Sequence, residues 1–369
     1  MNGQVPTAVD WLKEVPKQID LNSQTEFSIC LPDPPSSLLV TVELRSLVDG
    51  SVAECKVTEA EGKYTVSILP TCRGRHELTI SAGGTPLEGT PLKILVCCPP
   101  QMLGRPVNII NGVSRPAGVA LRGNGELVVT ETEPAAVCIR DREGKVIKSL
   151  EQGSPQLDSP YGVAIDSEGC IYVAELIDCK VHKFSRDGEF LKAVGGECSG
   201  KEDVGFPAGI KINRQDHIYI CDDTNKKVHV FDKNLDKLFS FGESGEAPGH
   251  FQGPSDVAFD ADGNIFVADT KKEKIMKFSA RGEFSSEFEI KGQSSELELG
   301  ICVGPSGHLF VSDFWNNQVV VFDASGQFVT LFGRKGAEPG EFDTPAGITV
   351  DDDGFVYVCD QLNSRIQVF

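Results

Sequence analysis

The chain has 369 residues and a formal net charge of −19, from 35 basic and 54 acidic residues. This length is enough for two domains, and the acidic balance disfavours general nucleic-acid binding, because phosphate contacts need a positive surface. There is no apolar run of about 18 residues, so no membrane-spanning helix is expected. The first residues also lack the basic and apolar segments of a secretory signal, which predicts a cytoplasmic protein.

The twelve cysteines are scattered along the chain, without a C-x-x-C pair or a histidine at zinc-ligand spacing. Several of them lie in apolar strand-like runs, where a thiol behaves as a small apolar group. This usage is typical of a reduced cytoplasmic protein. We expect no metal and no other cofactor.

Residues 1–15 are polar and form a lead-in without a periodic pattern. From residue 16 to 96, short strand-like runs alternate with turns such as Asp49-Gly50 and Glu61-Gly62. This pattern predicts an antiparallel β-sandwich of the immunoglobulin-like class. The segment 62–96 resembles the filamin-type repeat, with its G-x-Y, P-x-x-x-G and G-x-P-x motifs. Residues 97–104 form a short linker with prolines.

A unit with a P-x-G-V opening or a close variant recurs through residues 105–369. Each copy contains four short runs rich in β-branched and aromatic residues, with glycine turns between them, and no helical period. Such a unit is a four-stranded blade that cannot bury both faces alone, so six copies predict a six-bladed β-propeller. The copies begin at Pro116, Pro160, Pro207, Pro254, Glu298 and Pro345.

The two ends of the repeat region complement each other. The sixth copy stops at Phe369 after its third strand, and an unassigned strand-like run precedes the first copy. We therefore expect residues 105–111 to supply the fourth strand of the last blade and to close the ring.

The P-x-G-V opening, the I-Y-V-A-D-like second strand and the N-x-R-I-Q-V-F ending at Asn363–Phe369 resemble the NHL repeat, whose known forms are six-bladed propellers. A filamin-type repeat directly before six NHL repeats resembles the C-terminal half of the tripartite-motif NHL (TRIM-NHL) proteins. The resemblance implies that the propeller selects substrates for a ubiquitin ligase. The RING, B-box and coiled-coil segments of that family are not recognisable here, so no ligase chemistry is expected from these residues.

An acid ends the second strand of every copy. Six carboxylates raise the hypothesis of a metal site. A residue repeated once per blade serves the blade, however, and a carboxylate at a strand end can accept N–H bonds from the next turn. We therefore predict a structural carboxylate ring of Glu131, Glu175, Asp222, Asp269, Asp313 and Asp360.

Four of the six copies have a basic residue five positions after this acid. In a propeller, the loop after the second strand shares one face with the loops between blades. Blade five also carries Phe314-Trp315 in this loop, and exposed aromatics there are typical of binding hot spots; packing of Trp315 over an adjacent loop is the alternative. The predicted partner-binding residues are Phe314, Trp315, Lys180, Lys227, Lys274 and Arg365.

In NHL proteins this face can bind single-stranded RNA, and a basic arc on blades three and four is the place where this chain could do so. The alternative is a solvated rim paired with neighbouring acids, and acidic residues outnumber basic ones in the loops of this face. The arc consists of Lys226, Lys227, Lys271, Lys272 and Lys274.

No nucleophile elbow, P-loop or dinucleotide fingerprint is present, and the six histidines lie singly and out of repeat phase. The sequence therefore predicts a non-catalytic protein-recognition module without a small-molecule substrate, in which the acidic rim steers a basic partner. RNA binding through the same face is the first alternative, and a propeller enzyme is the second.

Overall fold

The structure is a computed structural model that describes residues 15–30, 40–60, 63–82, 84–87, 89–150, 157–196, 204–290 and 299–369. Most of the lead-in and Glu298, the first residue of the fifth repeat, lie outside the described residues. The chain forms two compact units, one built from residues up to Met102 and one from Leu103–Asp351 and Val356–Phe369. No helix in these described ranges is long and apolar enough to span a membrane.

The first unit is all-β, and its strands follow the order β1-β8-β6-β3-β4-β5-β2, with β7 beside β6. All pairs are antiparallel except β1 with β8. Alternate residues of β5 and β6 point into one core that contains Tyr64, Val66, Leu78 and Ile80. The elements are β1 (Gln18–Asp20), β2 (Thr25–Cys30), β3 (Val40–Ser46), β4 (Val52–Ala60), β5 (Lys63–Leu69), β6 (Gly74–Ala82), β7 (Thr85–Pro86), β8 (Leu92–Cys97) and the 3-10 turn η2 (Pro100–Met102).

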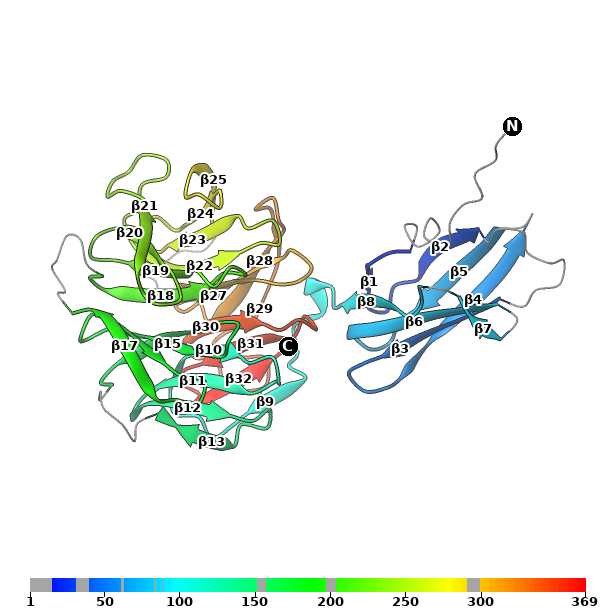
Figure 1. Ribbon diagram of the computed structural model, residues 1–369, viewed down its shortest axis with the longest axis horizontal. Coiled ribbons are helices and arrows are strands. Elements are labelled where there is room, and N and C mark those ends of the chain that lie inside the picture. Colours follow the sequence, from blue (N-terminus) through cyan, green and yellow to red (C-terminus); the bar gives the residue numbers. More distant parts are fainter. Residues whose placement is uncertain are drawn as a thin grey trace. The chain divides into compact units, whose positions relative to one another are not determined.

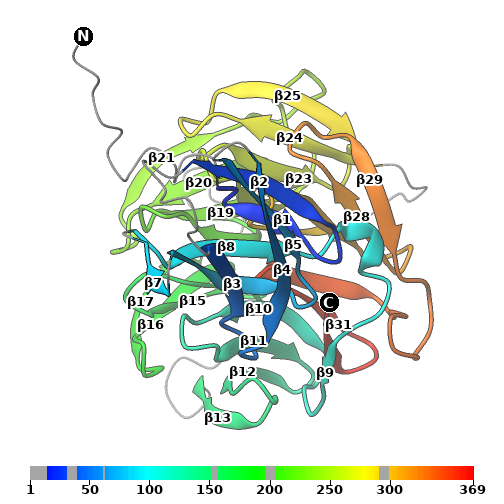
Figure 2. The ribbon, with the colours of Figure 1, turned by 90° about the vertical axis from the view of Figure 1, so that its right-hand side faces the viewer.

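The second unit contains six four-stranded antiparallel sheets, which follow one another around a ring in chain order (Figure 2). The predicted six-bladed β-propeller is therefore confirmed. The strands are β10 (Pro116–Leu121), β11 (Leu127–Thr132), β12 (Ala135–Arg140) and β13 (Val146–Ser149) in blade one; β14 (Pro160–Ile165), β15 (Ile171–Glu175), β16 (Lys180–Phe184) and β17 (Phe190–Gly195) in blade two; β18 (Pro207–Ile212), β19 (Ile218–Asp222), β20 (Lys227–Phe231) and β21 (Lys237–Phe241) in blade three; β22 (Pro254–Phe259), β23 (Ile265–Asp269), β24 (Lys274–Phe278) and β25 (Phe284–Glu289) in blade four; β26 (Leu299–Val303), β27 (Leu309–Asp313), β28 (Gln318–Phe322) and β29 (Phe328–Phe332) in blade five; and β30 (Pro345–Val350), β31 (Val356–Asp360), β32 (Arg365–Val368) and β9 (Asn108–Ile110) in blade six.

The blades bury their faces against each other. The second strands β15, β19, β23 and β27 are buried at every position, because each lies between two neighbouring blades. Between blades three and four, for example, Tyr219 and Cys221 share a core with Phe251, Val257 and Phe278. Most of the apolar burial thus requires the ring and not the single blade.

The glycine of the P-x-G-V opening is required by the close approach of neighbouring first strands. A Cβ atom on Gly118 would lie 2.4 Å from the carbonyl oxygen of Tyr161, and one on Gly347 would lie 2.5 Å from that of Ala117. Neither glycine has a positive φ, so the reason is space and not backbone conformation. Blade four departs from this rule, because Asp256 occupies the glycine position.

The ring is closed by the strand that precedes blade one. Strand β9 pairs antiparallel with β32, and Ile110 lies opposite Ile366 while Asn108 lies opposite Val368 (Figure 1). Both isoleucines are buried. The predicted closure by residues 105–111 is confirmed, and it removes the unpaired edge that the last blade would otherwise expose.

Candidate functional site

A cavity of about 590 Å³ lies where the first strands of all six blades meet. These strands, β10, β14, β18, β22, β26 and β30, each contact the next one in a closed circle and are therefore the innermost strands of the ring. Aliphatic side chains of Val119, Val163, Ile210 and Ile348 line the walls. The volume falls in the range of sites that hold a small ligand or an inserted side chain.

The cavity also includes residues of one end of the ring, which we call the loop face: the loops between second and third strands together with the loops that enter each blade. Leu176, Phe206, Lys271, Phe314 and Trp315 line the cavity from this end. The Phe314 and Trp315 rings are 5.6 Å apart and T-shaped. Trp315 is 57% exposed and Phe314 is half-buried, so part of this aromatic pair is accessible at the loop face.

All six members of the carboxylate ring are buried. Asp222 accepts hydrogen bonds at the loop face from the N–H groups of Gly205 (2.8 Å) and Asn225 (3.0 Å), and Asp269 accepts one from Gln252 (2.7 Å). Backbone N–H groups also donate to Glu175, Asp313 and Asp360, whereas Glu131 pairs with Arg140. In blades two, three, four and six, the carboxylate therefore ties the loop that enters the blade to the loop after its second strand.

The pKa values of these acids depend on the partners that each blade provides. Burial alone would raise the pKa of Asp222, but hydrogen bonds from His229 and from the backbone of Asn225 and Gly205 outweigh it and lower the pKa to about 2. In blade four, burial dominates and the pKa of Asp269 is raised.

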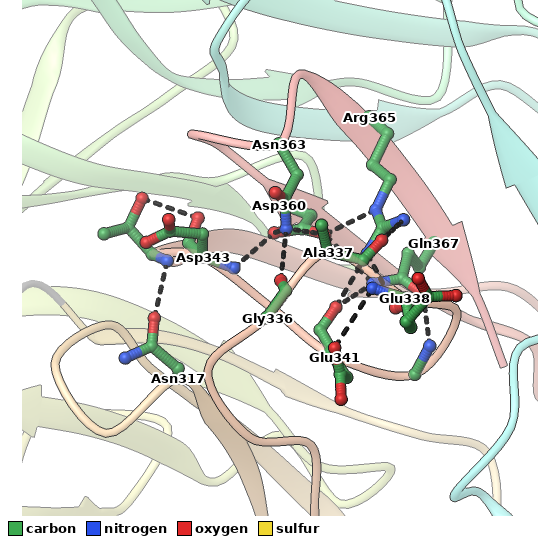
Figure 3. Close-up of polar contacts among 12 residues, drawn as sticks. Asn317, Gly336, Ala337, Glu338, Glu341, Asp343, Asp360, Asn363, Arg365 and Gln367 are labelled. Atoms are coloured by element: carbon green, nitrogen blue, oxygen red, sulfur yellow. Dashed lines mark hydrogen bonds and ion pairs between the residues drawn. The ribbon is translucent and has the colours of Figure 1, made fainter.

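Arg365 lies at the predicted repeat position, opposite Asp360, but its side chain is not exposed as the sequence analysis expected. Its side chain is buried and donates to Asp360 Oδ2 (2.6 Å), Ala337 O (2.6 Å), Glu338 O (3.0 Å) and Glu341 O (2.8 Å) (Figure 3). A guanidinium with this many internal acceptors is not available to a partner. The prediction that Arg365 contacts a partner is wrong, because the loop entering blade six folds over it.

The other three basic residues at this repeat position differ from one another. Lys180 lies 3.4 Å from Asp178, and Lys274 forms an ion pair with Glu287. Lys227 is half-buried and forms no ion pair within the described residues. Lys227 is thus the member of this set whose charge is least compensated.

Most lysines of the basic arc already contact hydrogen-bond acceptors within the protein. Lys226 Nζ lies 2.7 Å from Asp223 Oδ1, and Lys271 Nζ lies 3.4 Å from Asp223 Oδ2. Lys272 donates to the carbonyl oxygen of His250 at 2.6 Å. Together with Lys274, four of the five lysines already contact an acid or a carbonyl group, which weakens the electrostatic case for RNA.

The sequence analysis missed two charged residues that line the cavity. Lys211 Nζ on β18 lies 3.6 Å from Asp256 Oδ2 on β22 and 3.4 Å from the carbonyl oxygen of Ile348 on β30. Both residues depart from the repeat, since the other blades have small or uncharged residues where Lys211 lies and none has an acid where Asp256 lies. This departure was visible in the alignment of the copies and was the signal that could have identified them.

Comparisons with known proteins agree with this architecture. Residues 209–297 and 300–369 match the domain family DUF5128, described as a 6-bladed beta-propeller. A protein of unknown function from Bacteroides thetaiotaomicron shares the fold with a TM-score of 0.56 and 13% identity, over 96% of each chain. Virginiamycin B lyase from Staphylococcus aureus has a TM-score of 0.51 and 16% identity, over 89% of this chain and 99% of the lyase. A gluconolactonase from Xanthomonas campestris has a TM-score of 0.57 and 17% identity, over 73% of this chain and 92% of the lactonase.

These similarities overturn the prediction that the chain is not an enzyme. A lyase and a lactonase share the fold, at identities that show the fold alone. A propeller can gather polar residues from several blades at one end of its ring, so a catalytic set need not appear as a motif in the sequence. The histidine argument was also wrong, because His182 and His229 occupy the same position in the third strands of blades two and three.

Proposed function

We propose that this chain recognises a partner protein through the loop face of its propeller, with Phe314 and Trp315 as anchoring side chains. The observation that carries this proposal is the exposed Trp315 ring, which stands against Phe314 beside a cavity. Aromatic side chains at the edge of a pocket supply much of the binding energy of protein interfaces. The contact with Phe314 also restrains the Trp315 ring before binding, so less conformational entropy is lost.

The resemblance to TRIM-NHL proteins suggests which kind of partner the propeller recognises. A six-bladed propeller that follows an all-β unit is the order of domains in the C-terminal half of TRIM-NHL proteins, and we infer that the partner is a substrate presented for ubiquitination. In this proposal, residues 16–96 form a filamin-type immunoglobulin-like sandwich, joined by residues 97–104 to a propeller of residues 105–369. Strand β2 is an edge strand of its sheet, and a peptide of the partner can pair with this edge as an additional strand.

Replacement of Trp315 by alanine is expected to weaken capture of the partner at least about tenfold, because it removes the larger exposed ring of the anchor. The measurement is affinity capture from a cell extract with the full chain, followed by quantitative mass spectrometry. The control is Phe328→Ala, which removes an exposed aromatic ring from the outer strand of the same blade. The proposal fails if Trp315→Ala and Phe328→Ala retain the same proteins in the same amounts.

RNA binding is the alternative, and the observation in its favour is that Lys227 has no ion pair among the residues that the structure describes. The test is a salt series with the full chain and a pool of short single-stranded RNAs. Micromolar binding that weakens steeply with salt, and that disappears in Lys227→Glu, would replace protein recognition with RNA recognition. We expect no such binding, because the other lysines of the arc are compensated.

A further inference from the structure

The innermost strands contribute to the cavity a pair of charged residues that does not follow the six-fold repeat. Residues that recur from blade to blade are explained by the needs of the blade, as with the glycines of five blades and the carboxylates of all six. Lys211 and Asp256 come from different blades, break the repeat at two different positions and meet in the same cavity. Such convergence is what a binding site requires and what blade packing does not.

The two side chains differ in how well the protein satisfies them. Asp256 is fixed, because its two oxygen atoms accept the backbone N–H groups of Val257 and Ile301, each at 2.9 Å. The Ile301 bond also joins blade four to blade five. Asp256 therefore has a structural role that is complete without a ligand.

The Lys211 ammonium group is poorly satisfied by comparison. It has three protons to donate, and among the described residues its contacts are the Ile348 carbonyl at 3.4 Å and Asp256 at 3.6 Å. Charge-assisted hydrogen bonds of good geometry are nearer 2.7–2.9 Å. The side chain is 22% exposed and lines the cavity, so its remaining donor capacity is directed at whatever occupies that space.

The surroundings define the ligand further. Burial raises the pKa of the nearby Cys302 thiol to about 12, so this neighbour is uncharged at neutral pH. At the mouth, Asp223 lies 3.4 Å from Lys271 and 2.7 Å from Lys226, so it adds no uncompensated negative charge there. The walls are aliphatic and the entrance is aromatic. Because Lys211 already lies 3.6 Å from Asp256, a bound carboxylate leaves one excess negative charge in the cavity and a doubly charged phosphate leaves two. The smaller excess costs less in an apolar lining, so a single negative charge on an otherwise apolar molecule is the better match.

We propose that the central cavity binds an apolar carboxylate, whose charged group is held by Lys211 and whose apolar part packs on the aliphatic walls below Phe314 and Trp315. The sequence analysis expected no small-molecule substrate, because the chain has no recognisable catalytic or nucleotide-binding motif. The carboxylate can come from a free organic acid or from the C-terminus of a peptide. The cavity site does not depend on the proposed protein recognition at the rim.

The test is a calorimetric titration of the full chain with 3-phenylpropanoate and with its uncharged isostere, 3-phenylpropanamide. We expect the acid to bind in the millimolar range or tighter with a stoichiometry of one, and the amide to bind at least about tenfold more weakly. Acetyl-Gly-Gly-Phe and its C-terminal amide form the second arm. Tighter binding of the peptide acid identifies a chain end as the source, and tighter binding of the free acid identifies a small molecule.

Lys211→Met keeps the length of the side chain and removes its charge, and it is expected to reduce binding of the acid about tenfold or more. Because this change leaves Asp256 without a cation, Lys211→Met/Asp256→Asn is measured beside it, and thermal unfolding verifies that both variants are folded. The control is Lys192→Met, on the outer strand of blade two. The proposal is overturned if neither acid binds at millimolar concentration, if acid and amide bind equally, or if both Lys211 variants bind like wild type.

The experiments distinguish failure of the cavity site from failure of protein recognition at the loop face. Lys211-dependent binding of 3-phenylpropanoate together with unchanged protein capture by Trp315→Ala would support the cavity site and reject the proposed function. Loss of protein capture in Trp315→Ala without any binding of the acids would do the reverse.

Discussion

Replacing Arg365 with alanine is expected to lower the free energy of unfolding of the propeller by about 3–5 kcal/mol, the cost of breaking a buried ion pair from one side. The Arg365 guanidinium is the centre of the cluster that joins β32 to the loop entering blade six (Figure 3). Its removal leaves the carbonyl groups of Ala337, Glu338 and Glu341 without this donor and leaves Asp360 with less compensation for its buried charge. Blade six also closes the ring, so removal of the Arg365 side chain weakens the blade on which ring closure depends.

The repeat supplies a matched control for this change. Lys227 occupies the position of Arg365 in blade three, but it forms no ion pair within the described part of the chain, and Lys227→Ala is expected to change stability by about 0.5 kcal/mol or less. Denaturant unfolding can be followed through Trp315 fluorescence after Trp11→Phe leaves it as the single tryptophan. Equal effects of the two alanine variants would contradict the structural role of Arg365.

Acidification is expected to remove about 2 kcal/mol of stability that Asp222 supplies at neutral pH. The pKa of this carboxyl group is lowered from 3.8 to about 2 in the folded protein. A lowered pKa means that the unfolded chain binds the proton more readily, so the stabilisation is complete above the unfolded value of 3.8 and is lost as the pH falls through about 2. Denaturant unfolding of wild type and Asp222→Asn, compared between neutral pH and about pH 3, measures the onset of this loss.

Two further variants test the physical cause of the lowered pKa of Asp222. His229 donates to Asp222 at 3.0 Å, and blade four has Met276 at the same position. We therefore expect His229→Met to reduce the acid dependence that Asp222 confers. Asp269→Asn should act in the opposite direction, because burial raises the pKa of Asp269 and its charged form is destabilising above that pKa. Identical pH profiles for wild type and Asp222→Asn would show that Asp222 is not stabilised as described.

Local sequence patterns were sufficient to predict the propeller. Each blade is encoded by short apolar runs separated by glycine turns, and six copies make the period unmistakable. Ring closure was also predictable, because the last copy lacks one strand and the run at residues 105–111 supplies it. The carboxylates at the ends of the second strands follow the same logic, since a repeated residue answers a repeated local requirement, and the backbone bonds of Asp222 and Asp269 show that requirement.

The functional residues depend on loops and on contacts between blades, which local patterns do not reveal. Arg365 looks in the sequence like the lysines of the other blades, yet the loop entering blade six supplies three carbonyl groups that bury it. The sequence does not tell whether Trp315 packs inward or outward, and the structure shows it 57% exposed against the Phe314 ring.

Lys211 and Asp256 are 45 positions apart in the sequence, and the circular arrangement of the first strands brings their charged groups to 3.6 Å from each other. The sequence alone thus determined the blades, their number and the closure of the ring, because hydrophobic alternation and turn chemistry act over a few residues. The cavity, its charged pair and the accessibility of the rim were decided by the tertiary structure, because they arise only where separate blades and loops meet.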